Sequence, residues 1–124
     1  MSAAALLMTT APAGEAERLA TMLVEQRLAA CVQALPVVST YRWQGAVERA
    51  DELLLLVKTA PDRADAATDA IAAAHSYEVP EILRFDAGGG LPAYLTWIAA
   101  ATREIERPPP PATASPAPGP AWIE

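Results

Sequence analysis

Basic residues are scarce in this chain of 124 residues. Nine lysines and arginines stand against fifteen aspartates and glutamates, which gives a formal net charge of -6, and Lys58 is the single lysine. A protein that binds nucleic acid needs a basic stripe to neutralise the phosphates. The composition therefore argues against nucleic acid as a partner.

Long apolar runs are missing as well. No stretch reaches the roughly 18 consecutive apolar residues that a membrane helix needs. The first eight residues, MSAAALLM, lack the basic start and the apolar length of a secretory signal peptide. We therefore expect a cytoplasmic protein with no membrane partner.

Thiols and imidazoles, the usual ligands of soft metals, occur once each, as Cys31 and His75. A closed structural zinc site wants about four ligands, so one chain cannot build it from Cys and His alone. A copper site with two or three ligands stays open if Cys31, His75, a methionine or a carboxylate meet, within one chain or across subunits. The competing interpretations are a buried, inert thiol and a hydrogen-bonded histidine.

Prolines are concentrated at one end of the chain. Seven of the twelve lie between Arg107 and Pro120, a segment that can donate few backbone hydrogen bonds. The length leaves room for one hydrophobic core. We expect one domain over residues 1–106 and a proline-rich tail over residues 107–124, either disordered or docked on the domain.

The hydrophobic pattern predicts alternating strands and helices. Strands are expected over 4–10, 30–43, 46–59 and 81–85, and helices over 15–27, 61–74 and 92–101. Gln44-Gly45 supplies a hairpin turn, and Pro36 predicts a bulge in the first arm of that hairpin. In the second helix we expect Ala67, Ala70, Ile71 and Ala74 to face inward. The order predicts an α+β, ferredoxin-like (βαββαβ) two-layer sandwich with an antiparallel sheet and an extra C-terminal helix.

Residues 53–57, LLLLV, form an unbroken apolar run instead of an alternating one. Such a strand is removed from water on both faces. In a two-layer sandwich the helices cover only one face of the sheet, so something outside the protomer must cover the other. We therefore expect a homo-oligomer.

Polar chemistry is concentrated in the segment His75–Glu81, HSYEVPE, which holds the only histidine beside two carboxylates, a phenol and a proline. Pro80 pushes the residue before it out of the helical region, which predicts an extended entry into a strand. Glu78 and Glu81 suffice in principle for general acid and base roles, but three residues apart in an extended chain they point to opposite faces. No nucleophile motif accompanies them, so we expect no enzymatic activity.

Five segments resemble the CutA family of divalent-cation tolerance proteins, in order and at family-like spacing. They are Ala29–Val32, Tyr41–Gly45, Leu54–Thr59, His75–Glu81 and Pro92–Ile98. The resemblance covers roughly residues 6–103 and implies a tight homotrimer, similar in build to PII signalling proteins, with clefts between subunits. It also implies an association with copper and other metal tolerance, without an established reaction. The chain departs from members regarded as copper binders, which have a Cys in place of Thr9 and a His in place of Ala74.

The expected working surface is the intersubunit cleft around His75–Glu81. Its candidate residues are Tyr41, Arg42, Trp43, Lys58, His75, Tyr77, Glu78 and Glu81. The candidate metal ligands are His75 and Cys31, for copper or another divalent cation, and we expect no organic cofactor. Tyr41 and Trp43 could instead pack against a neighbouring subunit, and Lys58 could emerge into solvent. The alternative function is a PII-like regulatory module that senses a small anionic metabolite and contacts a partner protein.

Overall fold

The computed structural model describes residues 2–103, so the expected tail over residues 107–124 lies outside the described residues. In chain order the elements are β1 (Ala4–Ala11), α1 (Ala13–Glu25), β2 (Cys31–Trp43), β3 (Ala46–Thr59), the short 3-10 helix η1 (Pro61–Arg63), α2 (Ala64–Ala74), β4 (Ile82–Ala87) and α3 (Pro92–Ala101). The predicted order of strands and helices is confirmed. None of the described helices combines the length and the apolar character needed to cross a membrane.

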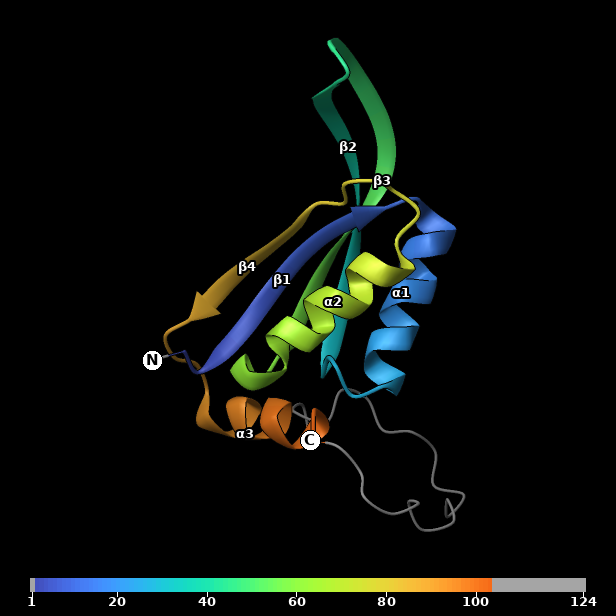
Figure 1. Cartoon of the computed structure of the whole chain (residues 1–124). Coiled ribbons are helices and arrows are strands. Elements are labelled where there is room, and N and C mark those ends of the chain that lie inside the picture. The colour runs from blue at the N-terminus through green and yellow to red at the C-terminus, as the bar shows by residue number, and fades with distance from the viewer. Residues whose placement is uncertain (1, 104–124) are drawn as a thin grey trace.

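The four strands form one sheet in the order β2-β3-β1-β4, and every neighbouring pair is antiparallel. Helices α1 and α2 lie across one face of this sheet, whereas α3 lies at one end of it (Figure 1). This arrangement is the predicted α+β ferredoxin-like sandwich with an additional C-terminal helix.

The hydrophobic core lies between the sheet and helices α1 and α2. Its fully buried side chains include Leu7, Leu23, Leu55, Val57 and Ile71. Small alanines on α2 allow the helix to pack closely, and Ala67 is completely buried as predicted. The inward position predicted for Ala74 is wrong: this residue is exposed, because it ends α2, where a helix is less covered than in its middle.

Strands β2 and β3 form a long hairpin that projects beyond the body of the protein (Figure 1). Its turn is Gln44-Gly45, as predicted, and the positive φ values of 50° and 83° fit a two-residue type I′ turn. The predicted bulge at Pro36 is wrong, since β2 pairs with β3 in one unbroken register over its whole length. Because β2 is an edge strand, a residue without an N–H is tolerated there.

The face of the sheet opposite α1 and α2 is mainly apolar. The strand register places on it the apolar side chains of Leu6, Met8, Leu35, Val37, Leu54, Leu56, Leu83 and Phe85, together with the polar Gln33, Glu52 and Lys58. Leu83 and Phe85 remain 53% and 48% exposed. The apolar run of β3 thus buries Leu55 and Val57 under the helices and presents its alternate leucines to this open sheet face.

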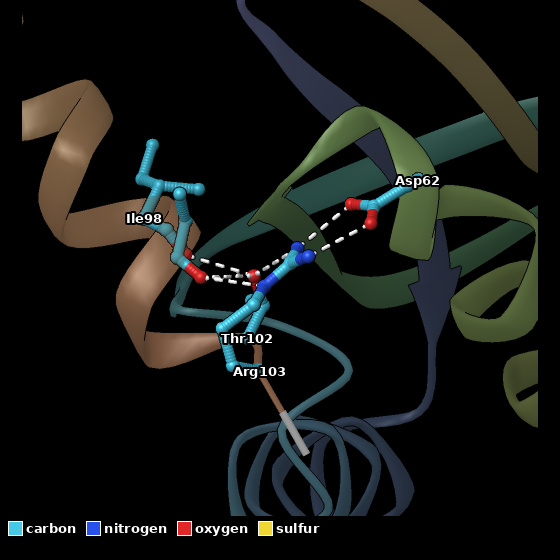
Figure 2. Close-up of polar contacts among 5 residues, drawn as sticks. Asp62, Ile98, Thr102 and Arg103 are labelled. Carbon is cyan, nitrogen blue, oxygen red and sulfur yellow. Dashed lines mark hydrogen bonds and ion pairs between the residues drawn. The ribbon is translucent and has the colours of Figure 1, made fainter.

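Helix α3 is fixed to the rest of the chain at its C-terminal end. The Thr102 hydroxyl donates a hydrogen bond of 2.8 Å to the Ile98 carbonyl. The Arg103 guanidinium donates two hydrogen bonds, of 2.7 and 2.8 Å, to the Asp62 carboxylate of η1 (Figure 2). The hydrogen bonds from Arg103 lower the pKa of the Asp62 carboxyl. This fork therefore joins the end of α3 to the start of the α2 segment.

Candidate functional site

A groove of about 650 Å³ lies between the outer half of the β2–β3 hairpin and the segment that connects α2 to β4. Its lining combines three aromatic rings, three carboxylates, three hydroxyl groups and two apolar residues. They are Tyr41, Trp43, Tyr77, Glu52, Glu78, Glu81, Thr10, Ser39, Thr40, Val79 and Pro80. A concave site of this size, which combines aromatic rings with converging polar groups, is typical of small-ligand sites.

His75 fixes the connector at its start. Its Nε2 lies 2.7 Å from the carbonyl oxygen of Thr10, and its Nδ1 accepts a hydrogen bond of 3.1 Å from the Tyr77 N–H. Because a carbonyl only accepts, this network requires the neutral tautomer with its proton on Nε2. The side chain has no exposed surface. Both ring nitrogens are therefore engaged within the protomer.

The next residue ties the connector to α1. Ser76 donates hydrogen bonds from its hydroxyl, at 2.7 Å, and from its backbone N–H to the Glu15 carboxylate. The hydroxyl bond from Ser76 is the main cause that lowers the pKa of Glu15, against the opposing effect of burial. Glu15 Oε1 also lies 3.7 Å from His75 Nδ1. The connector is thus held by β1 on one side and by α1 on the other.

Tyr77 forms one wall of the groove. Its hydroxyl donates a hydrogen bond of 2.8 Å to Glu52 Oε2, and its ring centre lies 4.7 Å from that of His75. Burial, together with the hydrogen bond to Glu52, raises the pKa of Tyr77 to about 12. The phenol therefore stays protonated near neutral pH and remains a donor to the buried carboxylate.

The connector does not run as an extended chain. It bends from Ser76 to Val79, and β4 begins only at Ile82. The prediction that Glu78 and Glu81 point to opposite faces is therefore wrong, since both line the groove. The physical reason is that the contacts of His75 and Ser76 hold the chain away from the path of a straight strand.

The structure brings together five of the eight predicted cleft residues. Tyr41, Trp43, Tyr77, Glu78 and Glu81 all line the groove. His75 lies outside the lining and positions Tyr77. Lys58 is six residues from Glu52 along β3, roughly 20 Å away, and its Nζ lies 5.9 Å from the centre of the Tyr94 ring. Arg42 is exposed on the hairpin, outside the lining. Within one protomer, Lys58 and Arg42 do not reach the groove.

The two predicted metal ligands do not meet within one protomer. Cys31 pairs with Lys58, which in turn pairs with Leu6, whereas His75 contacts Thr10, four residues or roughly 13 Å further along β1. Among residues 2–103, no group of three or more His, Cys, Asp or Glu side chains is placed to hold a metal ion. A metal site that uses Cys31 or His75 would need ligands from another protomer, and it stays a prediction.

Sequence reasoning missed several residues that build the site. Glu52 could have been identified from the sequence, because it directly precedes the apolar run 53–57 and an acid next to a buried strand can itself be buried. Glu15 and Thr10 carried none, since their partners Ser76 and His75 lie 61 and 65 residues away. Only the folded arrangement of β1, α1 and the connector brings these groups together.

Two comparisons place the sequence among known proteins. The model of the CutA1 divalent ion tolerance protein family matches residues 5–101. The divalent-cation tolerance protein CutA of Thermus thermophilus is 43% identical over 95 residues, which is 75% of this chain and 92% of the relative. The chloroplastic protein CutA 1 of rice is 40% identical over 101 residues, 80% of this chain. The chain spans only 57% of the rice protein and 51% of the mouse protein CutA.

Solved structures agree with these matches. CutA from Xylella fastidiosa superposes with a TM-score of 0.80 at 43% identity, over 82% of this chain and all of that one. The PII-like protein CutA from a Nostoc species gives a TM-score of 0.78 at 30% identity, over 80% of this chain and 97% of that one. The family model covers most of the chain, and sequence relatives and solved structures of the same family agree with it, so the chain belongs to the CutA1 divalent ion tolerance family.

Proposed function

We propose that this protein acts in divalent-cation tolerance as a homotrimer, and that the groove becomes part of an intersubunit cleft that binds a metal ion or a small ligand. Membership of the family supports the role in tolerance. The open sheet face supports assembly, because an apolar patch of this kind marks an interaction surface. Ligand binding rests on one observation, the groove of about 650 Å³ with its three carboxylates and three aromatic rings.

The charge of the groove favours a cation as its ligand. Glu52, Glu78 and Glu81 line it, and the described lining residues include no Lys, Arg or His. An anion would meet like charges unless a neighbouring protomer supplied a base such as Lys58 or Arg42. Because of this repulsion, regulation by a small anionic metabolite is only the second candidate function. The observation that favours it is the similarity to the PII-like protein CutA from Nostoc.

The donor atoms bear on which cation suits the groove. Carboxylate oxygens suit hard divalent cations, whereas copper prefers imidazole and sulfur. His75 could ligate a metal only if one of its two hydrogen bonds broke, and Cys31 could do so only at a contact with another protomer.

We also propose that the protein is not an enzyme. Cys31 and His75 cannot form a nucleophile pair within one protomer, which supports this proposal.

Equilibrium titration of the purified protein with Cu(II), Zn(II) and Mg(II) tests ligand binding. We expect saturable binding of at least one ion, weakened about tenfold or more by the double change Glu78→Gln and Glu81→Gln. His75→Ala measures whether the imidazole is a ligand. Glu48→Gln, on β3 but outside the groove lining, is the matched control for lost charge. Indistinguishable isotherms for the double variant and the control would remove the groove carboxylates as ligands.

A further inference from the structure

Aromatic rings and carboxylates share the groove, and this combination favours some classes of cation over others. Tyr41, Trp43 and Tyr77 are 44%, 40% and 37% exposed, so each ring keeps surface that a ligand can cover. The face of an aromatic ring attracts a cation within about 6 Å of its centre. A hydrated divalent metal ion gains from oxygen ligands and not from ring faces. The rings therefore favour a cation that carries carbon as well as charge.

Glu52 distinguishes this groove from an ordinary acidic surface. The residue is 7% exposed, and its Oε2 accepts the hydrogen bond from Tyr77. Within residues 2–103 no donor is bonded to its other oxygen, Oε1. A buried carboxylate needs partners for its charge, and one phenol hydroxyl supplies only one hydrogen bond. A hydrogen-bond donor on a ligand in the groove would supply the hydrogen bond that Oε1 of Glu52 lacks within the described part of the chain.

The wall around Glu52 is held in place before any ligand arrives. Tyr77 is fixed at its hydroxyl by Glu52 and at its backbone N–H by His75. Ser76, one residue earlier, is held by two hydrogen bonds to Glu15. A groove whose wall is ordered in advance loses less entropy on binding.

We propose that the groove recognises an organic cation, an alkylammonium or guanidinium group whose N–H groups bond to Glu52 while its carbon skeleton packs against Tyr77 and Tyr41. This inference rests on the proposed ligand-binding function and narrows its ligand class. Glu78 and Glu81 add attraction to the same charge. The cation can come from a free small molecule or from an arginine or lysine side chain of a second copy of this chain.

Calorimetric titration of the full chain with n-butylguanidinium and n-butylammonium tests the proposal, with n-butanol and butyrate as neutral and anionic controls. We expect saturable binding of the two cations and none of the controls. Glu52→Gln keeps an acceptor for Tyr77 but removes the charge, so it should weaken binding about tenfold or more. Tyr41→Leu keeps apolar bulk but removes the ring face, so it should weaken binding about two- to fivefold.

Glu48→Gln, on the same strand but outside the groove lining, serves as the matched control and should change the affinity by less than about twofold. If the groove is instead occupied by an arginine or lysine side chain of a second copy of this chain, we expect a different set of results. No added cation would then bind, but Glu52→Gln, unlike Glu48→Gln, would raise the concentration at which the oligomer dissociates by about tenfold.

The proposal is overturned if neither pattern appears, or if n-butanol binds as tightly as the cations. Saturable metal binding that persists in that case would leave the proposed tolerance function standing. The two proposals can therefore fail separately.

Discussion

At the scale of single residues, His75 organises the connector between α2 and β4. Its donated and accepted hydrogen bonds hold the carbonyl of Thr10 and the N–H of Tyr77. Ser76 then binds Glu15, and Tyr77 binds Glu52, so three consecutive residues each hold a different part of the fold. One side of the groove is therefore set by a short chain of polar contacts and not by hydrophobic packing alone.

The contact between Ser76 and Glu15 predicts a specific dependence of stability on pH. The pKa of Glu15 is lowered in the folded protein from its ordinary value of 4.5, chiefly by the Ser76 hydroxyl. The ionised form thus contributes stability at pH values above 4.5, and this contribution is lost as the pH falls through the folded-state pKa. We expect Glu15→Gln to lower the free energy of unfolding by about 1 kcal/mol at neutral pH and by less at an acid pH where the carboxyl is protonated in the folded protein as well.

Urea denaturation followed by circular dichroism at both pH values measures this difference. Glu17→Gln, an exposed acid on the same helix, is the control for the loss of one charge. The role assigned to Glu15 is wrong if the two variants lose the same stability at both pH values.

At the scale of elements, local chemistry predicted most of the fold. Helix and strand periodicity predicted every strand and α-helix, although the helix expected over 61–74 is divided into η1 and α2. Gly45 indicated the hairpin turn because glycine accepts positive φ. The bulge at Pro36 failed because the effect of a proline depends on whether its strand is at the edge, which is a property of the whole sheet.

The candidate site was less accessible to sequence reasoning than the fold. The segment His75–Glu81 could be identified by its polar residues, and its aromatic partners Tyr41 and Trp43 on the hairpin by resemblance to a family, whereas the acidic partner Glu52 was missed. The bend that turns Glu78 and Glu81 to the same groove depends on contacts with residues more than sixty positions away. Such long-range polar contacts leave no periodic pattern in a sequence.

The anchoring of α3 is also testable at this scale. Arg103 bonds to Asp62 at both guanidinium ends and to the Ala99 carbonyl through Nε at 2.9 Å. We expect Arg103→Gln to speed hydrogen exchange in the last turn of α3 and to lower global stability by only about 0.5 kcal/mol, because the pair is exposed to solvent. Hydrogen exchange followed by mass spectrometry measures the local effect, and exposed Arg49→Gln is the control. Unchanged exchange in α3 would mean that the apolar cluster around Ile98 alone holds the helix.

At the scale of the whole molecule, the protomer buries most of its apolar surface on one side of the sheet, and α3 covers only one end of the other side. The helices cover the face that carries Leu55 and Val57, while the open sheet face keeps Leu83 and Phe85 about half exposed. An apolar sheet face of this extent in contact with water is unfavourable and prone to association. Self-association through this face would remove it from water, and would place a neighbouring protomer beside the strands that contribute to the groove.

Phe85→Glu tests this arrangement, because a carboxylate inside an apolar interface loses hydration without gaining a partner. In sedimentation velocity we expect the unmodified protein at three times the 13.0 kDa mass of one chain, and Phe85→Glu at one or two times that mass with its secondary structure retained. Val24→Glu, which places the same charge on a 43% exposed apolar position of α1, should leave the trimer intact. A stable monomer of the unmodified protein, or equal dissociation by both substitutions, would contradict assembly through the sheet. In that case the exposed leucines and Phe85 would need a different cover, and a groove shared between subunits would lose its physical basis.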